Sequence, residues 1–312
     1  MLVSAVVCGY SMERDEAIAA CIESLLSQTY DPLEIVVVVD GNPSLRAFLE
    51  ERFGSDTSMR IFENETNRGI SYSRTQGGEL ADGEIVAFID DDAVAEPDWI
   101  ERLVETYEET DAIAVGGFVA PNWVDAKPTF FPEEFYWLVG CTERGFAEDG
   151  EEVRNTYGSN ISYRREAFLA VGGYDVNTGR KGDQHVQAHE APVGIRLRNE
   201  YDQGMIYVAD AVVHHTLFPY RGEFHWLVSR SFWQGFSKRV MDTLYPETYG
   251  NERTYLRDLF ARHLPRRVRK AFLGPSFTQL QQIVAILVFT GAVFLGYVYA
   301  MTKRDLRREA EE

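Results

Sequence analysis

Short apolar runs alternate with longer amphipathic segments along the first third of the chain. Residues 2–8, 34–39 and 84–89 are mostly apolar and rich in β-branched side chains, which is typical of buried strands in a parallel sheet. Residues 15–28 lie between the first two runs and carry apolar side chains at helical spacing: Ile18, Ile22, Leu25 and Leu26. This alternation predicts βαβ units and therefore an α/β domain with a mainly parallel sheet.

Three consecutive aspartates, Asp90, Asp91 and Asp92, follow the third of these runs. In open α/β sheets, ligands bind beyond the carboxyl ends of the strands, and three adjacent carboxylates repel one another unless a cation lies among them. Oxygen ligands suit Mg²⁺ or Mn²⁺, and such ions usually share their coordination with substrate phosphates. The aspartates therefore predict a site for a metal and a diphosphate. The alternative is a helix N-cap, for which one aspartate would suffice.

Two other predicted strands end in residues that suit a nucleotide. The first ends at Cys8-Gly9-Tyr10, where the glycine lets the backbone approach a ligand closely. The second ends at Asp40, which could bond a ribose hydroxyl or a base edge, or could be a turn residue before Gly41. The dinucleotide-binding and P-loop glycine motifs do not occur in the sequence, so those two readings lose their main support.

Taken together, these segments resemble the family 2 glycosyltransferases. The resemblance covers about residues 1–220 and rests on Cys8-Gly9-Tyr10, residues 24–30 and 34–40, Asn67-Arg68-Gly69, Ser73-Arg74 and residues 88–92. It implies a GT-A fold, a nucleotide-sugar donor, a divalent metal and inversion at the anomeric carbon. It also places Asp90 and Asp92 at the acidic positions of the metal-binding motif, and Asp40 at the nucleoside-binding aspartate. Arg74 matches a basic position near the donor phosphates, with a structural arginine as the alternative.

The resemblance extends to the catalytic base. The family usually shows two acidic residues at the start of a helix, and here Glu190 occupies the first position while Ala191 replaces the second. One carboxylate near an acceptor hydroxyl is enough for general-base catalysis. We therefore predict Glu190 as the base, with Asp183 as the second choice. The alternative for Glu190 is a first-turn helix residue stabilised by the helix dipole.

Two further positions follow from the same resemblance. Asn160 lies in the segment that resembles the donor-sugar and acceptor region, so it is predicted to bond sugar hydroxyls, with a strand-end turn residue as the alternative. Related enzymes often have a histidine near the end of the last strand, where it joins the metal. Of the adjacent pair His214-His215, we favour His214 as this ligand, with a structural histidine as the alternative.

The last third of the chain has a different pattern. Residues 222–244 predict an amphipathic helix with an aromatic face, and a basic cluster follows: Arg262, Arg266, Arg267, Arg269 and Lys270. Anionic lipid headgroups, an acceptor diphosphate or a solvated face would explain the cluster. Residues 283–301 are almost wholly apolar and span roughly 28 Å as a helix, close to the roughly 30 Å of a bilayer core. The pattern predicts a membrane-proximal region at 221–275, a transmembrane helix at 280–302 and a charged tail at 303–312, with a buried soluble helix as the alternative.

Composition narrows the partners and the source. The net charge of −18 and the pI of about 4.8 argue against a nucleic acid partner. Lysines are rare, and an acidic, lysine-poor surface suits a halophilic archaeon, although an ordinary acidic protein is the alternative. The three cysteines show no metal-ligand spacing, which favours a reducing compartment.

These observations predict a membrane-anchored, inverting glycosyltransferase. The apolar C-terminal helix suggests a lipid-linked glycan acceptor on dolichyl phosphate, as in archaeal protein N-glycosylation, and membrane lipids as partners. The catalytic domain is expected on the cytoplasmic side of the cell membrane, because nucleotide sugars are made there. A polysaccharide or protein acceptor is one alternative. A non-catalytic sugar-nucleotide-binding subunit of an assembly complex is another, since Ala191 replaces an acid.

Overall fold

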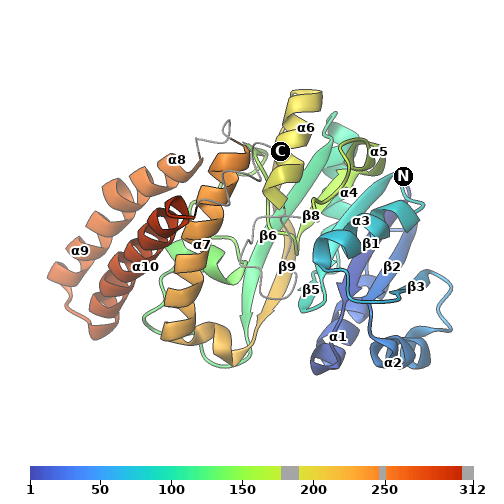
Figure 1. Cartoon of the computed structure of the whole chain (residues 1–312), viewed down its shortest axis with the longest axis horizontal. Coiled ribbons are helices and arrows are strands. Elements are labelled where there is room, and N and C mark those ends of the chain that lie inside the picture. Colours follow the sequence, from blue (N-terminus) through green and yellow to red (C-terminus); the bar gives the residue numbers. More distant parts are fainter. Residues whose placement is uncertain (177–189, 246–250, 304–312) are drawn as a thin grey trace.

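The computed structural model describes residues 1–176, 190–245 and 251–303. These residues form a nine-stranded sheet with helices on both faces, and a group of C-terminal helices packs against one side of it (Figure 1). The strands follow one another in the order β3-β2-β1-β4-β8-β6-β9-β5, and β7 pairs with β9. The predicted α/β architecture is confirmed.

The first half of the sheet is parallel and consists largely of the predicted apolar runs. Its strands are β1 (Val3–Gly9), β2 (Leu33–Asp40), β3 (Met59–Asn64) and β4 (Ile85–Asp90). Because side chains alternate between the two faces of a strand, each face has its own core cluster. One cluster is covered by α1 (Asp15–Leu26), α2 (Pro43–Phe53) and α4 (Trp99–Glu109). The other is covered by α3 (Ile70–Leu80), α5 (Arg165–Ala170) and α6 (Glu190–Tyr201).

The second half of the sheet is mixed, so the predicted parallel arrangement holds for the first half. β8 (Ile161–Arg164) is antiparallel to both β4 and β6 (Ala114–Trp123). β9 (Met205–Leu217) runs parallel to β6 and antiparallel to two short strands, β5 (Ala93–Ala95) and β7 (Glu152–Val153). Because β5 directly follows the three aspartates, its pairing with β9 brings the end of β9 next to them.

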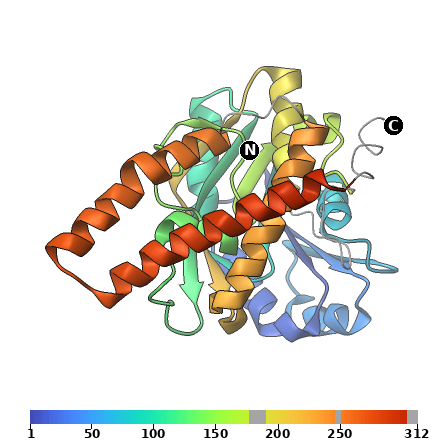
Figure 2. The same ribbon diagram turned by 60° about the vertical axis from the view of Figure 1, so that its left-hand side comes forward.

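The described residues beyond β9 are mostly helical. The short helix η3 (Pro219–Gly222) leads into α7 (Phe224–Leu244), α8 (Asn251–Asp258), a π-helical turn (Leu259–His263), α9 (Leu264–Leu273) and α10 (Phe277–Met301). α10 crosses α7 and lies beside α9 (Figure 2). A third core cluster joins these helices to η2 (Glu133–Val139). The predicted apolar run thus lies in one continuous helix, which is long and apolar enough to cross a membrane, with a mean hydropathy of 2.2.

Candidate active site

The carboxyl ends of β1, β2 and β4 meet at one edge of the sheet, and a cavity of about 1070 Å³ opens there. The strand register sets Cys8 of β1 opposite Asp90 of β4. The cavity is lined by the side chains predicted to meet the donor: Cys8, Gly9, Tyr10, Asp40, Arg74, Asp90, Asp91 and Asp92. Residues far apart in the sequence are therefore brought together at one edge, as the strand-end argument predicted.

Asp92 is the most tightly held of the three aspartates. Its Oδ2 atom accepts hydrogen bonds from Nη1 of Arg14 at 3.1 Å and from Nη2 of Arg221 at 3.0 Å. Burial by itself raises the pKa of Asp92, but the charges of His215, Arg221 and Arg14 outweigh it and hold the pKa well below its usual range. Asp92 is therefore ionised, and the two arginines fix its position.

Asp91 has the opposite electrostatic balance. It is buried, and its Oδ1 atom accepts a hydrogen bond from Nη1 of Arg14 at 3.3 Å. Burial and the neighbouring charge of Asp92 raise the pKa of Asp91 to about 7, in spite of Arg14. The pKa of Asp91 is thus raised and that of the adjacent Asp92 is lowered. Such opposite shifts are typical of functional sites where carboxylates lie close together.

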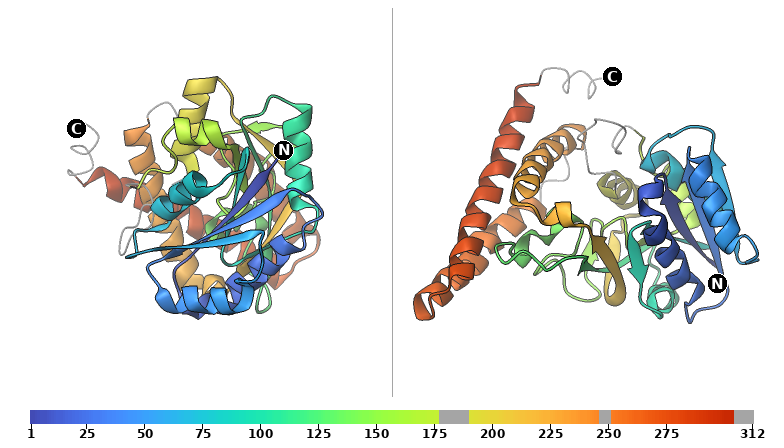
Figure 3. Two further views of the ribbon diagram at one scale, coloured as in Figure 1. Left: turned by 90° about the vertical axis from the view of Figure 1, so that its right-hand side faces the viewer. Right: turned by 90° about the horizontal axis from the view of Figure 1, so that it is seen from below.

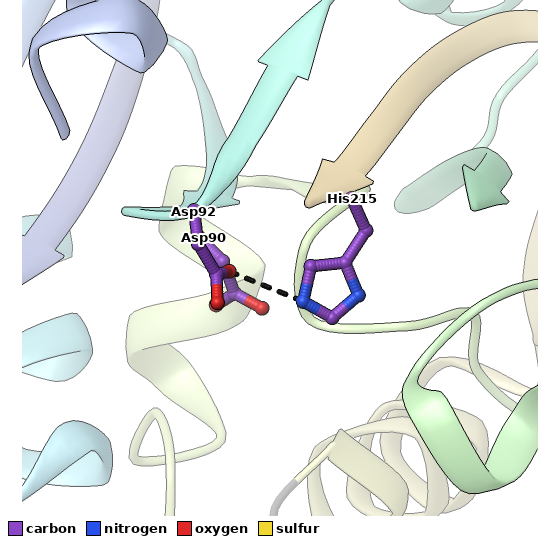
Figure 4. Close-up of side chains that lie close together, drawn as sticks. All are labelled: Asp90, Asp92 and His215. Carbon is purple, nitrogen blue, oxygen red and sulfur yellow. Dashed lines mark ion pairs between the residues drawn. The ribbon is translucent and has the colours of Figure 1, made fainter. Parts of the chain in front are cut away.

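His215 completes a possible metal site with Asp90 and Asp92. One ligand atom from each of these three residues lies within 4.8 Å of the others. Figure 4 shows the imidazole, near the end of β9, facing the carboxylates of Asp90, the last residue of β4, and of Asp92, which follows the strand. Nε2 of His215 lies 3.1 Å from Oδ1 of Asp92. Two carboxylates and one imidazole are a donor set that suits a divalent cation such as Mn²⁺, so these residues fit the predicted metal.

The prediction that His214 is the metal-binding histidine is wrong, because His215 occupies that position. Successive side chains of β9 face opposite sides, and Nε2 of His214 lies 2.7 Å from Oε1 of Glu96. His215 shares the inner face with Val213 and Leu217, which are both buried. The alternation of buried apolar residues along this strand was the sequence signal that distinguishes the two histidines.

Asp40 organises the loop that enters α3. Its Oδ1 atom accepts hydrogen bonds from Nδ2 of Asn64 at 2.8 Å and from the backbone N–H of Arg68 at 2.9 Å, and its Oδ2 atom accepts one from the N–H of Gly69 at 2.8 Å. Gly69 has a φ of 90°, which favours glycine at this turn. Asp40 therefore shapes this wall of the cavity as well as lining it.

Arg74 connects the aspartates to the predicted base. It is buried, and its Nη2 atom donates hydrogen bonds to Oδ1 of Asp90 at 2.5 Å and to the carbonyl oxygen of Gly158 at 2.9 Å. Its Nη1 atom lies 3.9 Å from Oε1 of Glu190. The guanidinium thus lies between the carboxylates of Asp90 and Glu190. These contacts give Arg74 a structural role beside the predicted donor site.

Glu190 is the first residue of α6 and lines the same cavity. Its Oε1 atom accepts a hydrogen bond from the backbone N–H of Gly158 at 3.1 Å. Ala191, where the family usually has a second acid, packs in an apolar cluster with Ile195 and Met241 of α7. The predicted base thus lies at the cavity wall, while Asp183 lies outside the described residues.

The predicted contact of Asn160 with a sugar is wrong. Asn160 is fully buried, and its Oδ1 atom accepts hydrogen bonds from Nε1 of Trp99 at 2.8 Å and from the N–H of Gly117 at 3.2 Å. Its Nδ2 group donates to the carbonyl oxygens of Phe118 at 2.9 Å and Ala211 at 2.8 Å. Both ends of the amide are therefore used to join β6, β8, β9 and α4.

Three site residues were missed by sequence reasoning. Arg14 ends the short helix η1 (Met12–Arg14), and Arg221 lies in η3, so each contacts Asp92 from a distant part of the chain. Glu143 also lines the cavity, where its Oε2 atom accepts a hydrogen bond from the hydroxyl of Tyr157. Burial raises the pKa of Glu143. The local sequence around these residues carries no signal for their contacts.

Comparison with known proteins identifies the family of the chain. A sequence profile described as Glycosyl transferase family 2 matches residues 4–172. Over 307 residues the chain is 59% identical to the glucosyl-dolichyl phosphate glucuronosyltransferase of Haloferax volcanii, and 98% of each chain is covered. A relative this similar over nearly its whole length leaves little room for a different fold.

Solved structures agree on the fold. The mannosyltransferase PcManGT from Pyrobaculum calidifontis, in complex with GDP-Man and Mn²⁺, gives a TM-score of 0.59 at 16% identity, with 97% of this chain and 87% of that chain covered. TarS from S. aureus, in complex with UDP-GlcNAc, gives 0.56 at 18% identity, with 100% and 90% covered. The protein has the GT-A fold and belongs to glycosyltransferase family 2.

Proposed function

We propose that this glycosyltransferase moves a glucuronosyl residue from a nucleotide diphosphate to a glucosyl-dolichyl phosphate acceptor, with inversion at the anomeric carbon. The choice of sugar and acceptor is supported by the Haloferax volcanii relative, whose name states that activity and whose sequence is 59% identical. In this proposal the product serves protein N-glycosylation, and the chain is attached to the cytoplasmic face of the cell membrane, where nucleotide sugars are made. Residues 1–220 form the catalytic domain.

The donor diphosphate lies at the carboxyl edge of β1, β2 and β4. Asp90, Asp92 and His215 would hold Mn²⁺ or Mg²⁺ there, and PcManGT was solved in complex with GDP-Man and Mn²⁺. Such an ion would supply positive charge for the leaving diphosphate. Arg14 and Arg221 keep Asp92 ionised and in place, and Arg74 holds Asp90 in place through their ion pair.

Glu190 removes the proton from the attacking acceptor hydroxyl. Its carboxylate is oriented by the N–H of Gly158, and that same loop is held by Arg74, so base and donor site share one support. The hydroxyl attacks from the side opposite the diphosphate, which gives inversion. A second carboxylate is not needed for this step, and the apolar packing of Ala191 fits its replacement.

The residues that line the cavity support the proposal of a lipid-linked acceptor. The cavity that begins at the aspartates is also lined by α7 and by Thr290 and Val293 of α10, the long apolar helix. Arg230 and Lys238 of α7 line it between these ends and can offer positive charge to the acceptor phosphate. A headgroup entering beside α10 therefore reaches Glu190 while its lipid stays outside.

The test uses the purified full chain in high salt with glucosyl-dolichyl phosphate and a panel of UDP-glucuronic acid, UDP-glucose, UDP-GlcNAc and GDP-mannose. We expect nucleotide release and a heavier lipid with UDP-glucuronic acid and Mn²⁺, and loss of both with a chelator. Transfer of another sugar from this panel would overturn the choice of donor. Donor binding without any transfer would favour the non-catalytic alternative.

A further inference from the structure

We propose that α10 lies in the plane of the membrane surface rather than crossing the bilayer, and that it seats the catalytic domain on anionic lipids. The length and composition of α10 fit a spanning helix, so the inference rests instead on how its two faces are used. It goes beyond the proposed function, because it depends on neither the sugar nor the acceptor.

One face of α10 is packed against η2 of the catalytic domain and against α7 and α9. Ile286 and Phe289 are fully buried in the core cluster shared with η2 and α7. Further along, α10 and α7 cross at two glycines. A Cβ on Gly235 would lie 1.9 Å from the carbonyl oxygen of Val293, and one on Gly296 would lie 1.8 Å from that of Phe232. The backbones therefore touch, and this side of α10 has no room for lipid.

Polar contacts tie the same face to the domain. Nε2 of Gln282 donates to the carbonyl oxygen of Thr129 at 2.9 Å, and Arg267 of α9 donates to Oε1 of Gln282. Near the other end, the hydroxyl of Tyr297 donates to Oδ2 of Asp242 in α7 at 2.8 Å. If α10 crossed the bilayer in this arrangement, the charged residues of α7 and the ion pairs of η2 would enter the hydrocarbon, where charges are costly and rare.

The opposite face of α10 is an exposed apolar stripe that runs the length of the helix. Apart from the adjacent pair Phe294 and Leu295, its members recur at intervals of three to seven residues: Phe277, Leu280, Val284, Leu287, Phe294, Leu295, Val298 and Met301. Phe272 and Leu273 continue it at the corner between α9 and α10, where they are 84% and 76% exposed. In Figure 3 (right), α10 forms one whole side of the molecule, with the catalytic domain on its other side. Because the other face is packed against protein, the apolar stripe is the part of α10 left to meet the membrane, as the apolar face of an interfacial helix does.

Charge identifies the surface that this stripe meets. α9 and the turn before it present exposed basic side chains in a chain whose net charge is −18: Arg262, Arg266, Arg269 and Lys270. Arg267, from the same cluster, instead pairs with the buried Glu134 and holds α9 against η2, with Nη2 and Oε2 2.6 Å apart. Basic residues beside an apolar stripe match anionic headgroups above acyl chains. Because concentrated salt screens charge, the apolar stripe carries most of the attachment in a halophile.

Cysteine labelling across a sealed membrane tests this inference. The three native cysteines are buried, so the wild-type chain provides the background. Ser276→Cys and Lys303→Cys place exposed thiols at the two ends of α10, and Ser55→Cys marks the catalytic domain. Each variant is expressed as the full chain and treated with a membrane-impermeant maleimide in right-side-out and in inverted vesicles. Labelling after detergent treatment confirms that each thiol is reactive.

We expect the same ratio of inverted to right-side-out labelling for all three variants, because an in-plane helix keeps both of its ends on the side of the catalytic domain. A reversed ratio for Lys303→Cys relative to the other two would show that α10 crosses the bilayer and would overturn the inference. Recovery of the chain outside the membrane fraction would overturn it as well. The labelling is independent of turnover, so its outcome is separate from that of the proposed function.

Discussion

The two ends of the cavity are held by different kinds of contact. At the donor end, side chains from strand ends are fixed by buried ion pairs, such as those from Arg14 and Arg221 to Asp92. At the α10 end, the walls are helix surfaces joined by apolar packing and by the glycine crossing of α7 and α10. The register of the sheet fixes the side chains at the donor end, and helix packing fixes the walls at the α10 end.

The family match follows this difference in part. The profile of family 2 covers residues 4–172, which include the aspartates, Arg14 and Arg74 and end before α6, His215, Arg221 and the C-terminal helices. A donor diphosphate needs charges at fixed positions, and a strand edge supplies them. In the proposed function the acceptor enters along the C-terminal helices, which lie outside this matched segment. Substitutions at the two ends should therefore affect different measured quantities.

The largest effect is expected for the predicted base. Glu190→Gln keeps the shape of the side chain and can still accept the N–H of Gly158, but its amide cannot take up a proton. General-base catalysis typically contributes about 10²–10⁴-fold. We expect kcat to fall by about that factor while the affinity for UDP-glucuronic acid, measured by calorimetry, stays unchanged.

Glu143→Gln is the matched control for this substitution. Glu143 is a second carboxylate in the same cavity, and it accepts a hydrogen bond from Tyr157. If Glu143→Gln abolished transfer and Glu190→Gln did not, the base would have to be reassigned to Glu143. If Glu190→Gln weakened donor binding as strongly as turnover, its role would be structural.

The donor end was largely predictable because its signals are local. Two of the short apolar runs end in an aspartate, and parallel strands place those ends at one edge, so the sequence alone was enough to group Asp40 with Asp90. The histidine required one more step. His215 is two residues from both Val213 and Leu217, so it faces the same side of the strand as these buried apolar residues. This alternation would have favoured His215 over His214.

The remaining features depend on contacts between distant parts of the chain. The partners of Asn160 include Trp99 and Ala211, and those of Asp92 include Arg14 and Arg221, so no local pattern could reveal them. The apolar run of α10 predicted a helix and its length. It did not predict which face is packed, because that depends on the position of α7.

The pair of histidines gives the next largest effect. His215→Ala removes one predicted metal ligand, and His214→Ala removes a side chain that contacts Glu96 on the opposite face of β9. Residues that support a metal site are typically worth about 10–100-fold in metal affinity. We expect the Mn²⁺ concentration for half-maximal transfer to rise by at least about that factor for His215→Ala and to stay unchanged for His214→Ala. Equal effects would argue against the Asp90, Asp92 and His215 site.

Asn160 joins β6, β8, β9 and α4, so its removal should affect stability more than chemistry. Asn160→Ala leaves the N–H groups of Trp99 and Gly117 and the carbonyl oxygens of Phe118 and Ala211 without this partner in the core. A buried polar group that loses its partner costs about 1–3 kcal/mol. We expect the free energy of unfolding to fall by about 3 kcal/mol, with little change in the KM for the donor in the folded fraction. A large rise in that KM would restore the predicted sugar contact.

The smallest effect is expected at the crossing of α7 and α10, where two glycines of one helix can be compared. A methyl group at Gly296 meets the backbone of Phe232, whereas a methyl group at Gly291 meets open space among the described residues. Overpacking costs about 1–3 kcal/mol, and replacing glycine by alanine inside a helix returns about 0.5–1 kcal/mol. Gly296→Ala should therefore lower the free energy of unfolding in detergent by about 1–2 kcal/mol, and Gly291→Ala should raise it slightly. Gly296→Ala and Gly291→Ala should both leave donor affinity unchanged, because the ion pairs at the strand ends are independent of this crossing.

Equal shifts in the free energy of unfolding for the two variants would mean that α10 does not rest on α7 in solution. The α10 end of the cavity would then lack the wall proposed for the acceptor.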